Sequence, residues 1–167
     1  MSVELLLVRH AIAFERNPLR WPDDRLRPLS PAGRQRFRKA AEGLGRWQPE
    51  IDRVFTSPLV RARETASMLA EHAGWPTAAE CPALAPRSDP EAVFTFLRRQ
   101  RGQRFALVGH EPDLSTLVAA CLPGTPSARS FEIKKGGLVC IAFEARPTAG
   151  TGLMTAFLAP RVLRTMR

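Results

Sequence analysis

The sequence predicts an α/β fold, a three-layer αβα sandwich in which helices cover both faces of a mostly parallel central sheet. Two short apolar runs, residues 3–8 and 105–108, fit buried strands of a parallel sheet, and residues 51–55 are a further strand candidate. Longer amphipathic segments with helix-start signals separate these runs. Such alternation of strands and helices is typical of layered α/β proteins.

The first helix is predicted from a serine–proline pair. The strand at residues 3–8 leads into a polar, proline-containing loop that extends to about residue 29, where Ser30 and Pro31 follow. Serine at the N-cap and proline at the first helical position make a common helix start. We therefore predict a helix from Pro31 to about Trp47, with Phe37 on its apolar face.

The second strand is followed by the same signal. Ser57 and Pro58 come directly after residues 51–55 and predict a helix that begins at Pro58 and ends near residue 72. Arg61 would then be the fourth helical residue, about one turn from the helix start.

The remainder of the chain continues the alternation of strands and helices. The last two predicted strands flank a loop that contains proline and glycine, so we expect them to pair with each other. The predicted elements are a short strand at 79–81, a helix at 90–100, the strand at 105–108, a helix from Pro112 to about Leu122, and strands at 138–143 and 153–158.

The size and apolar pattern bound the class of protein. With 167 residues the chain favours one domain, residues 1–167, and can bury a sizeable core. No apolar run is long enough to span a bilayer or to act as a secretory signal, so we expect a cytoplasmic protein without a membrane partner. Cys81, Cys121 and Cys140 form no CxxC pair and are expected to be buried thiols rather than disulfides or zinc ligands.

The charge is strongly positive. There are 25 basic and 16 acidic residues, a net charge of +9, and only three of the basic residues are lysines. Arginine suits bidentate binding of phosphate or carboxylate, so a basic nucleic-acid-binding protein is an alternative function. The cations are scattered along the chain, without a basic tail and without any tyrosine for stacking, which disfavours nucleic acid as the partner.

Three predicted strands end in residues that can bind or attack a phosphate. The first strand runs into Arg9 and His10, the second into Ser57 and then Arg61, and the third into His110. Because the carboxyl ends of parallel strands share one edge of the sheet, we expect these side chains to meet there.

Each residue type has a use at such an edge. A neutral imidazole can attack phosphorus and form a phosphohistidine, and guanidinium groups can hold the phosphoryl oxygens. Ser57 and Glu111 are expected to be helix N-caps, so that two helix starts point their N–H groups at the same region and Ser57 helps to bind the substrate.

Taken singly, these residues have plainer interpretations. A histidine after a strand is often only a hydrogen-bonded loop residue, and Arg61 can pair with Glu64 or Thr65 on its own helix. A metal hydrolase that uses His10 and His110 is disfavoured, because the chain lacks HxxE, HExxH and HxH ligand pairs. The repeated pattern of strand, cation or histidine, and proline-started helix favours a phosphate site.

Three segments resemble the signature segments of the histidine phosphatase superfamily: residues 7–11 (LVRHA), 56–66 (TSPLVRARETA) and 107–112 (LVGHEP). Residues 28–33 (PLSPAG) are similar to the start of the family's first helix. The resemblance covers nearly the whole chain and is greatest to the small SixA-type phosphohistidine phosphatases.

The resemblance implies a phosphoglycerate-mutase-like fold without a large lid insertion. It implies His10 as the nucleophile that becomes phosphorylated, and Arg9, Arg61 and His110 as the phosphate pocket. It also implies that no metal or organic cofactor takes part.

The chain departs from the family pattern at two places. Ala11 stands where the first motif usually has glycine, and its methyl group would crowd the pocket if φ there were positive. The larger family members supply a glutamate proton donor from a segment that here reads PALAP, residues 82–86, which has no carboxylate. Glu80, Glu111 and Asp24 are the alternative donors.

The missing carboxylate bears on the substrate, because an alkoxide leaving group needs a proton and an imidazole leaves readily. We therefore predict a metal-independent phosphatase that works through a phosphohistidine enzyme intermediate on phosphohistidine in a protein. A broad small-molecule phosphatase of the same superfamily is the alternative. A phosphoglycerate mutase is disfavoured, because the chain is too short for the insertion that closes over that substrate. Residues 132–137, with Lys134 and Lys135, are either a basic rim for an acidic protein substrate or a solvated turn.

Overall fold

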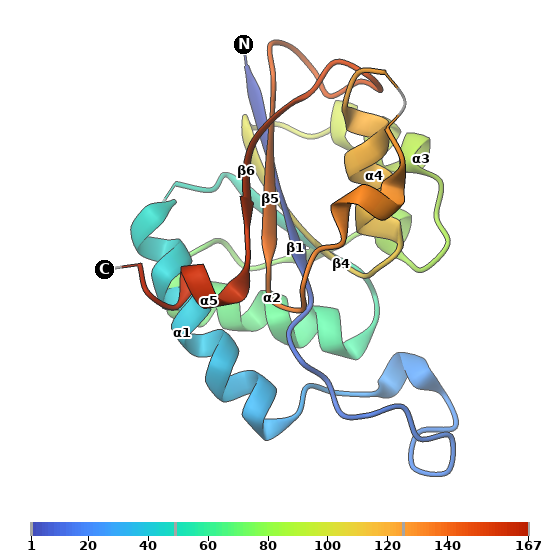
Figure 1. Ribbon diagram of the computed structural model, residues 1–167, viewed down its shortest axis with the longest axis vertical. Coiled ribbons are helices and arrows are strands. Elements are labelled where there is room, and N and C mark those ends of the chain that lie inside the picture. The colour runs from blue at the N-terminus through green and yellow to red at the C-terminus, as the bar shows by residue number, and fades with distance from the viewer. Residues whose placement is uncertain (1, 49, 125, 167) are drawn as a thin grey trace.

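A single sheet runs through the computed structural model, which describes residues 2–48, 50–124 and 126–166 (Figure 1). Its strand order is β3-β2-β4-β1-β5-β6. All neighbouring pairs among β3, β2, β4 and β1 are parallel, whereas β5 is antiparallel to both β1 and β6. The predicted α/β fold with a mostly parallel sheet is thus confirmed. The strands are β1 (Val3–Arg9), β2 (Arg53–Thr56), β3 (Ala79–Glu80), β4 (Arg104–Gly109), β5 (Leu138–Phe143) and β6 (Leu153–Leu158).

Helices cover both faces of this sheet. Figure 1 shows α1 and α5 on the side of the strands opposite to α3 and α4. The helices are α1 (Pro31–Trp47), α2 (Val60–Ala73), α3 (Pro90–Arg98), α4 (Asp113–Cys121) and the short α5 (Pro160–Leu163), with 3-10 turns η1 (Asp24–Leu26), η2 (Pro82–Leu84) and η3 (Ala128–Phe131). The sequence pattern did not predict α5 or the 3-10 turns, which are each too short to show an apolar period.

The alternation of side chains along β1 divides the core into two parts. Leu6 and Val8 pack in the cluster that contains the apolar faces of α1 and α2, and Leu5 and Leu7 pack in the cluster beneath α3 and α4. All four side chains are fully buried. A central strand with apolar residues on both faces is what a parallel sheet between two helix layers requires.

The two serine–proline pairs do not behave alike. At α1 the prediction is confirmed, since Ser30 Oγ accepts a hydrogen bond from the Gly33 N–H at 3.0 Å and Pro31 opens the helix. At α2 it is wrong, because the helix begins at Val60 after Leu59, and Ser57 lies directly after the end of β2. The Ser57 N–H donates to the Val108 carbonyl at 2.9 Å, which prolongs the pairing of β2 with β4.

The start of α4 also differs from the prediction. Pro112 is the N-cap and Asp113 the first helical residue, so Glu111 is not the cap. The Glu111 carboxylate instead accepts from the Ser115 hydroxyl at 2.6 Å and from the Ile133 N–H at 2.9 Å. It therefore ties the start of α4 to the segment before β5.

The three cysteines are buried free thiols, as predicted. Burial raises the pKa of Cys121 and of Cys140 to about 12, which keeps both thiols protonated. No helix in the described part of the chain is both long enough and apolar enough to cross a membrane.

Candidate active site

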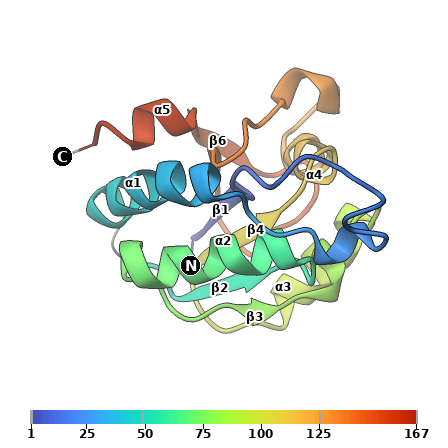
Figure 2. The ribbon, with the colours of Figure 1, turned by 90° about the horizontal axis from the view of Figure 1, so that it is seen from below.

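The carboxyl ends of β1, β2 and β4 bring the predicted site residues together. Arg9 at the end of β1 pairs with Gly109 of β4, and the His10 N–H donates to the Gly109 carbonyl at 3.0 Å. The rings of His10 and His110 are therefore neighbours, with their centroids 5.2 Å apart. Figure 2 looks toward this end of the sheet, where the segment between β1 and α1 extends to one side.

In the His10 ring, Nδ1 is hydrogen-bonded to the backbone and Nε2 is available to a substrate. Its Nδ1 lies 2.7 Å from the Ala11 carbonyl oxygen, which can only accept, so Nδ1 carries the hydrogen. Burial lowers the pKa of His10 to about 3, and the nearby charges of Arg61 and Arg9 act in the same direction. The ring is thus neutral at physiological pH and presents an unprotonated Nε2.

His110 is held by Ser57. The His110 Nε2 and Ser57 Oγ lie 2.6 Å apart, and both residues are buried. Burial lowers the pKa of His110 to about 3, with the charges of Arg61 and Arg9 as further causes. Ser57 thus contacts a site residue directly, although it does not cap α2.

Two arginines are anchored by one end of their guanidinium groups. Arg9 Nη1 donates to the Ile133 carbonyl at 2.6 Å. Arg61 Nη1 donates to the Asp24 carbonyl at 2.8 Å, and its Nη2 lies 3.3 Å from Asp24 Oδ2. Arg61 is the second residue of α2 rather than the fourth, because the helix begins later than predicted.

Three buried nitrogens of these residues have no hydrogen-bond partner. They are the only such side-chain atoms in the described part of the chain: Arg9 Nε, Arg61 Nε and His110 Nδ1. Buried polar groups are nearly always paired in native proteins, so unpaired guanidinium donors beside a neutral histidine indicate a site that binds an anion.

Thr65 and Asp24 belong to the site, but sequence reasoning did not place them there. Thr65 Oγ1 donates to the Arg61 carbonyl at 2.7 Å and accepts from the Ala11 N–H at 3.0 Å, so one hydroxyl links α2 to the turn after His10. The sequence indicates Asp24 only as an alternative proton donor, and nothing in its local sequence indicates a contact with Arg61. Of the two partners predicted for Arg61 on its own helix, Glu64 pairs with Arg34 instead, whereas Thr65 bonds to the Arg61 backbone carbonyl.

The three carboxylates predicted as alternative proton donors are all paired with other groups. Glu111 is bound to Ser115 and Ile133, and Glu80 lies 3.9 Å from Arg63 on the surface. The hydrogen bond from Arg27 and the charge of Arg61 hold the pKa of Asp24 below its usual range, which keeps it ionised.

Ala11 fits where the family pattern has glycine. Arg87 is the one non-glycine residue with positive φ among the described residues, so Ala11 has an ordinary backbone conformation. Its methyl group is buried, 2% exposed, in the core that α1 and α2 share. The backbone at Ala11 is therefore not strained, and the crowding of the pocket expected for a positive φ does not occur.

The site and fold define a class of protein. Residues 5–88 match the model of the histidine phosphatase superfamily (branch 1), and the chain belongs to that family. It is accordingly a phosphatase.

The chain is also similar to particular proteins of known sequence or structure. The chain is similar to the phosphohistidine phosphatase SixA of Escherichia coli, with 30% identity over 126 residues, or 73% of this chain and 76% of the relative. An uncharacterized protein of Picosynechococcus is 33% identical over 140 residues, or 82% of this chain and 83% of the relative. The structure of a protein histidine phosphatase SixA complexed with tungstate has the same fold, with a TM-score of 0.81, 23% identity, and 96% and 99% of the two chains covered.

Proposed function

We propose that the protein removes the phosphoryl group from phosphohistidine in a protein substrate, with His10 as nucleophile and without a metal ion. The observation that carries the proposal is the unprotonated Nε2 of buried His10 beside unpaired nitrogens of Arg9, Arg61 and His110. The similarity to an Escherichia coli phosphohistidine phosphatase supports the same substrate class.

The first chemical step transfers the phosphoryl group to the enzyme. The lone pair of His10 Nε2 attacks phosphorus, the bond from phosphorus to the substrate nitrogen breaks, and its electron pair stays on the substrate imidazole. Arg9, Arg61 and His110 hold the phosphoryl oxygens, where negative charge is greatest in the transition state. The Nδ1–H bond to the Ala11 carbonyl stabilises the positive charge that the His10 ring gains.

The second step returns the enzyme to its starting state. A water oxygen attacks the phosphorus on His10, and the bond to Nε2 breaks with its electron pair left on the ring. Inorganic phosphate is released and the proton lost by water leaves with phosphate or solvent.

The pairing of the three carboxylates favours phosphohistidine over an alkyl phosphate ester as the substrate. An alkoxide must be protonated as it leaves, but Glu80, Glu111 and Asp24 are paired with other groups. A phosphohistidine ring can carry a proton on its second nitrogen, and then it leaves as neutral imidazole without a donor from the enzyme.

The decisive experiment compares wild type and His10→Ala on a phosphohistidine peptide, an aryl phosphate and a set of sugar phosphates. We expect the peptide to give the highest kcat/KM in wild type, and His10→Ala to lower kcat by about four orders of magnitude or more, as for other nucleophile deletions. Rapid quench in alkali, in which phosphohistidine survives, should trap the phosphoryl group on His10.

Two results would contradict the proposal in different ways. Sugar phosphates turned over as well as the peptide would favour a broad small-molecule phosphatase, with His10 still the nucleophile. Full activity of His10→Ala would remove the phosphohistidine intermediate itself.

A further inference from the structure

A second pocket lies beside the candidate site, between α1, α5 and the turn before β5. Its volume is about 400 Å³, which is in the range of pockets that hold a ligand group. The floor is apolar and includes Phe37 and Pro160. We call it the basic pocket, because five cations and no carboxylate line it: Arg36, Lys134, Lys135, Arg161 and Arg164.

The positive charge of the basic pocket is poorly compensated. Lys134 pairs with Glu132 at 2.8 Å, and the other four cations form no ion pair with any residue that the structure describes. Like charges gathered on three segments repel one another, and an anionic partner would relieve that repulsion. The pocket therefore fits a partner that combines negative charge with apolar side chains.

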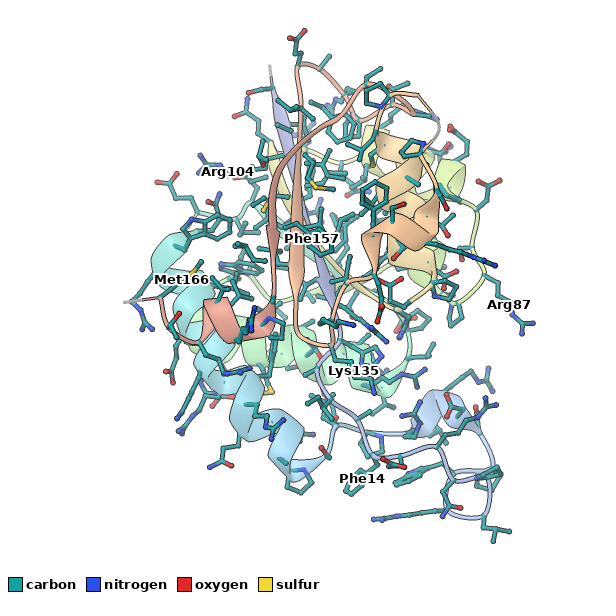
Figure 3. The ribbon with its side chains drawn as sticks, viewed as in Figure 1. Phe14, Arg87, Arg104, Lys135, Phe157 and Met166 are labelled. Atoms are coloured by element: carbon teal, nitrogen blue, oxygen red, sulfur yellow. The ribbon has the colours of Figure 1, made fainter. Side chains whose placement is uncertain are left out.

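The basic pocket adjoins the turn that carries His10. Ala11 and Gly136 line the pocket, and the Gly136 N–H lies 3.1 Å from the Arg9 carbonyl and 3.2 Å from the His10 carbonyl. Figure 3 shows Lys135 near the ends of β1 and β5, between α5 and the loop that carries Phe14. A polypeptide whose phosphohistidine enters the site can thus place neighbouring residues on the pocket.

The lining argues for a polypeptide rather than a small polyanion. Four of the cations are exposed, Arg164 is half-buried, and none is buried as in a site built to enclose a phosphate. Exposed charges on separate elements gain most from a partner that meets several of them at once.

We propose that the basic pocket docks an acidic segment that flanks the phosphohistidine of the protein substrate. Aspartate or glutamate side chains pair with the pocket cations, and an apolar side chain of the segment contacts Phe37 and Pro160. This inference rests on the proposed function and names the chemistry of its partner.

The test uses two phosphohistidine peptides of equal length, one with Asp and Glu flanks and one with Asn and Gln in their place. The pocket variant is Lys135→Glu with Arg161→Glu. The matched control is Arg99→Glu with Arg101→Glu, which makes the same charge change before β4, at the opposite end of the sheet from the site. We expect wild type to prefer the acidic peptide about tenfold in kcat/KM through KM, since each exposed ion pair contributes a factor of roughly two to five.

In the pocket variant this preference should disappear while the kinetics on the neutral peptide stay the same. The control variant should keep the preference to within about twofold, because its charges are more than a screening length away from the bound segment in 0.15 M salt.

Other outcomes would overturn the docking proposal. These are equal use of both peptides by wild type, equal losses in the two double variants, or a loss on the neutral peptide in the pocket variant. Micromolar binding of tripolyphosphate that the pocket variant lacks would assign the pocket to a small polyanion instead. Hydrolysis of neither peptide by wild type would instead contradict the proposed function.

Discussion

His10 and His110 are buried as neutral bases, and this affects stability as well as chemistry. Burial sets both pKa values at about 3, whereas an unfolded histidine titrates near 6.5. Above pH 6.5 neither state is protonated. As the pH falls below that value, the unfolded chain binds protons that the native protein does not, so native stability decreases until the pH passes about 3.

The size of this effect can be measured. At pH 5 each histidine should lower the free energy of unfolding by about 2 kcal/mol relative to pH 8, because one pKa unit corresponds to about 1.4 kcal/mol. Urea unfolding at the two pH values should therefore show a smaller loss in His110→Asn than in wild type. An unchanged difference would show that His110 does not resist protonation.

Ser57 is the contact that fixes the His110 ring, so it is a positioning residue. Ser57→Ala removes the hydrogen-bond partner of His110 Nε2 and leaves a buried nitrogen unpaired. We expect kcat to fall about tenfold with little change in KM, a loss within the usual cost of an unpaired buried group.

The matched control is Ser67→Ala, which removes an exposed α2 hydroxyl that donates to the Arg63 carbonyl at 3.0 Å. It should leave kcat unchanged. A Ser57→Ala enzyme with normal kcat, or one whose loss equals its drop in folded fraction, would contradict the positioning role.

At the residue scale the sequence predicted the convergence of His10, Arg9, Arg61 and His110, because all four follow strands of a parallel sheet. Asp24 could not be placed, since its contact with Arg61 depends on the conformation of a long loop. The function of Ser57 as a partner of His110 was hidden by its resemblance to a helix cap.

At the element scale, the difference between the two serine–proline pairs shows what local signals cannot supply. Ser30 follows a loop and is free to cap α1, whereas Ser57 follows β2 and is still bonded to β4 through its backbone. The two local sequences are alike, but the backbone hydrogen bond between Ser57 and β4 prevents the second helix from starting at Pro58. Strands and long helices were predictable because their apolar periods extend over several residues.

Two glycines of α1 offer a test of how this helix supports the site. A Cβ at Gly33 would collide with the Ile12 carbonyl, in the segment after His10, and a Cβ at Gly43 would collide with the Leu163 carbonyl in α5. Each Gly→Ala change should lower stability by about 2 kcal/mol, as expected for overpacking against backbone.

The two variants should differ in activity. Gly33→Ala displaces the segment that carries His10 and should lower kcat in the fully folded enzyme, whereas Gly43→Ala should leave kcat unchanged. Kinetics at a temperature where both are folded, checked by circular dichroism, separate the two effects. Equal kcat values for Gly33→Ala and Gly43→Ala would show that α1 does not set the position of His10.

At the scale of the whole molecule, the distribution of ligand-type side chains bears on metal dependence. Among residues 2–48, 50–124 and 126–166, no three His, Cys, Asp or Glu side chains gather in a group that could hold a metal ion. Phosphatase activity should therefore survive dialysis against EDTA within about twofold, since catalytic zinc sites use three protein ligands. Loss of activity that Zn²⁺ or Mg²⁺ restores would contradict this expectation.

The position of β4 between β1 and β2 has a consequence for the protein during its synthesis. The strand that aligns the other two is the last of the three to leave the ribosome. A nascent chain that stops before Arg104 contains His10 and Arg61 but lacks the strand that sets them side by side. Turnover by a nascent chain thus requires that this strand has emerged, so early phosphate release would report that the parallel part of the sheet has formed.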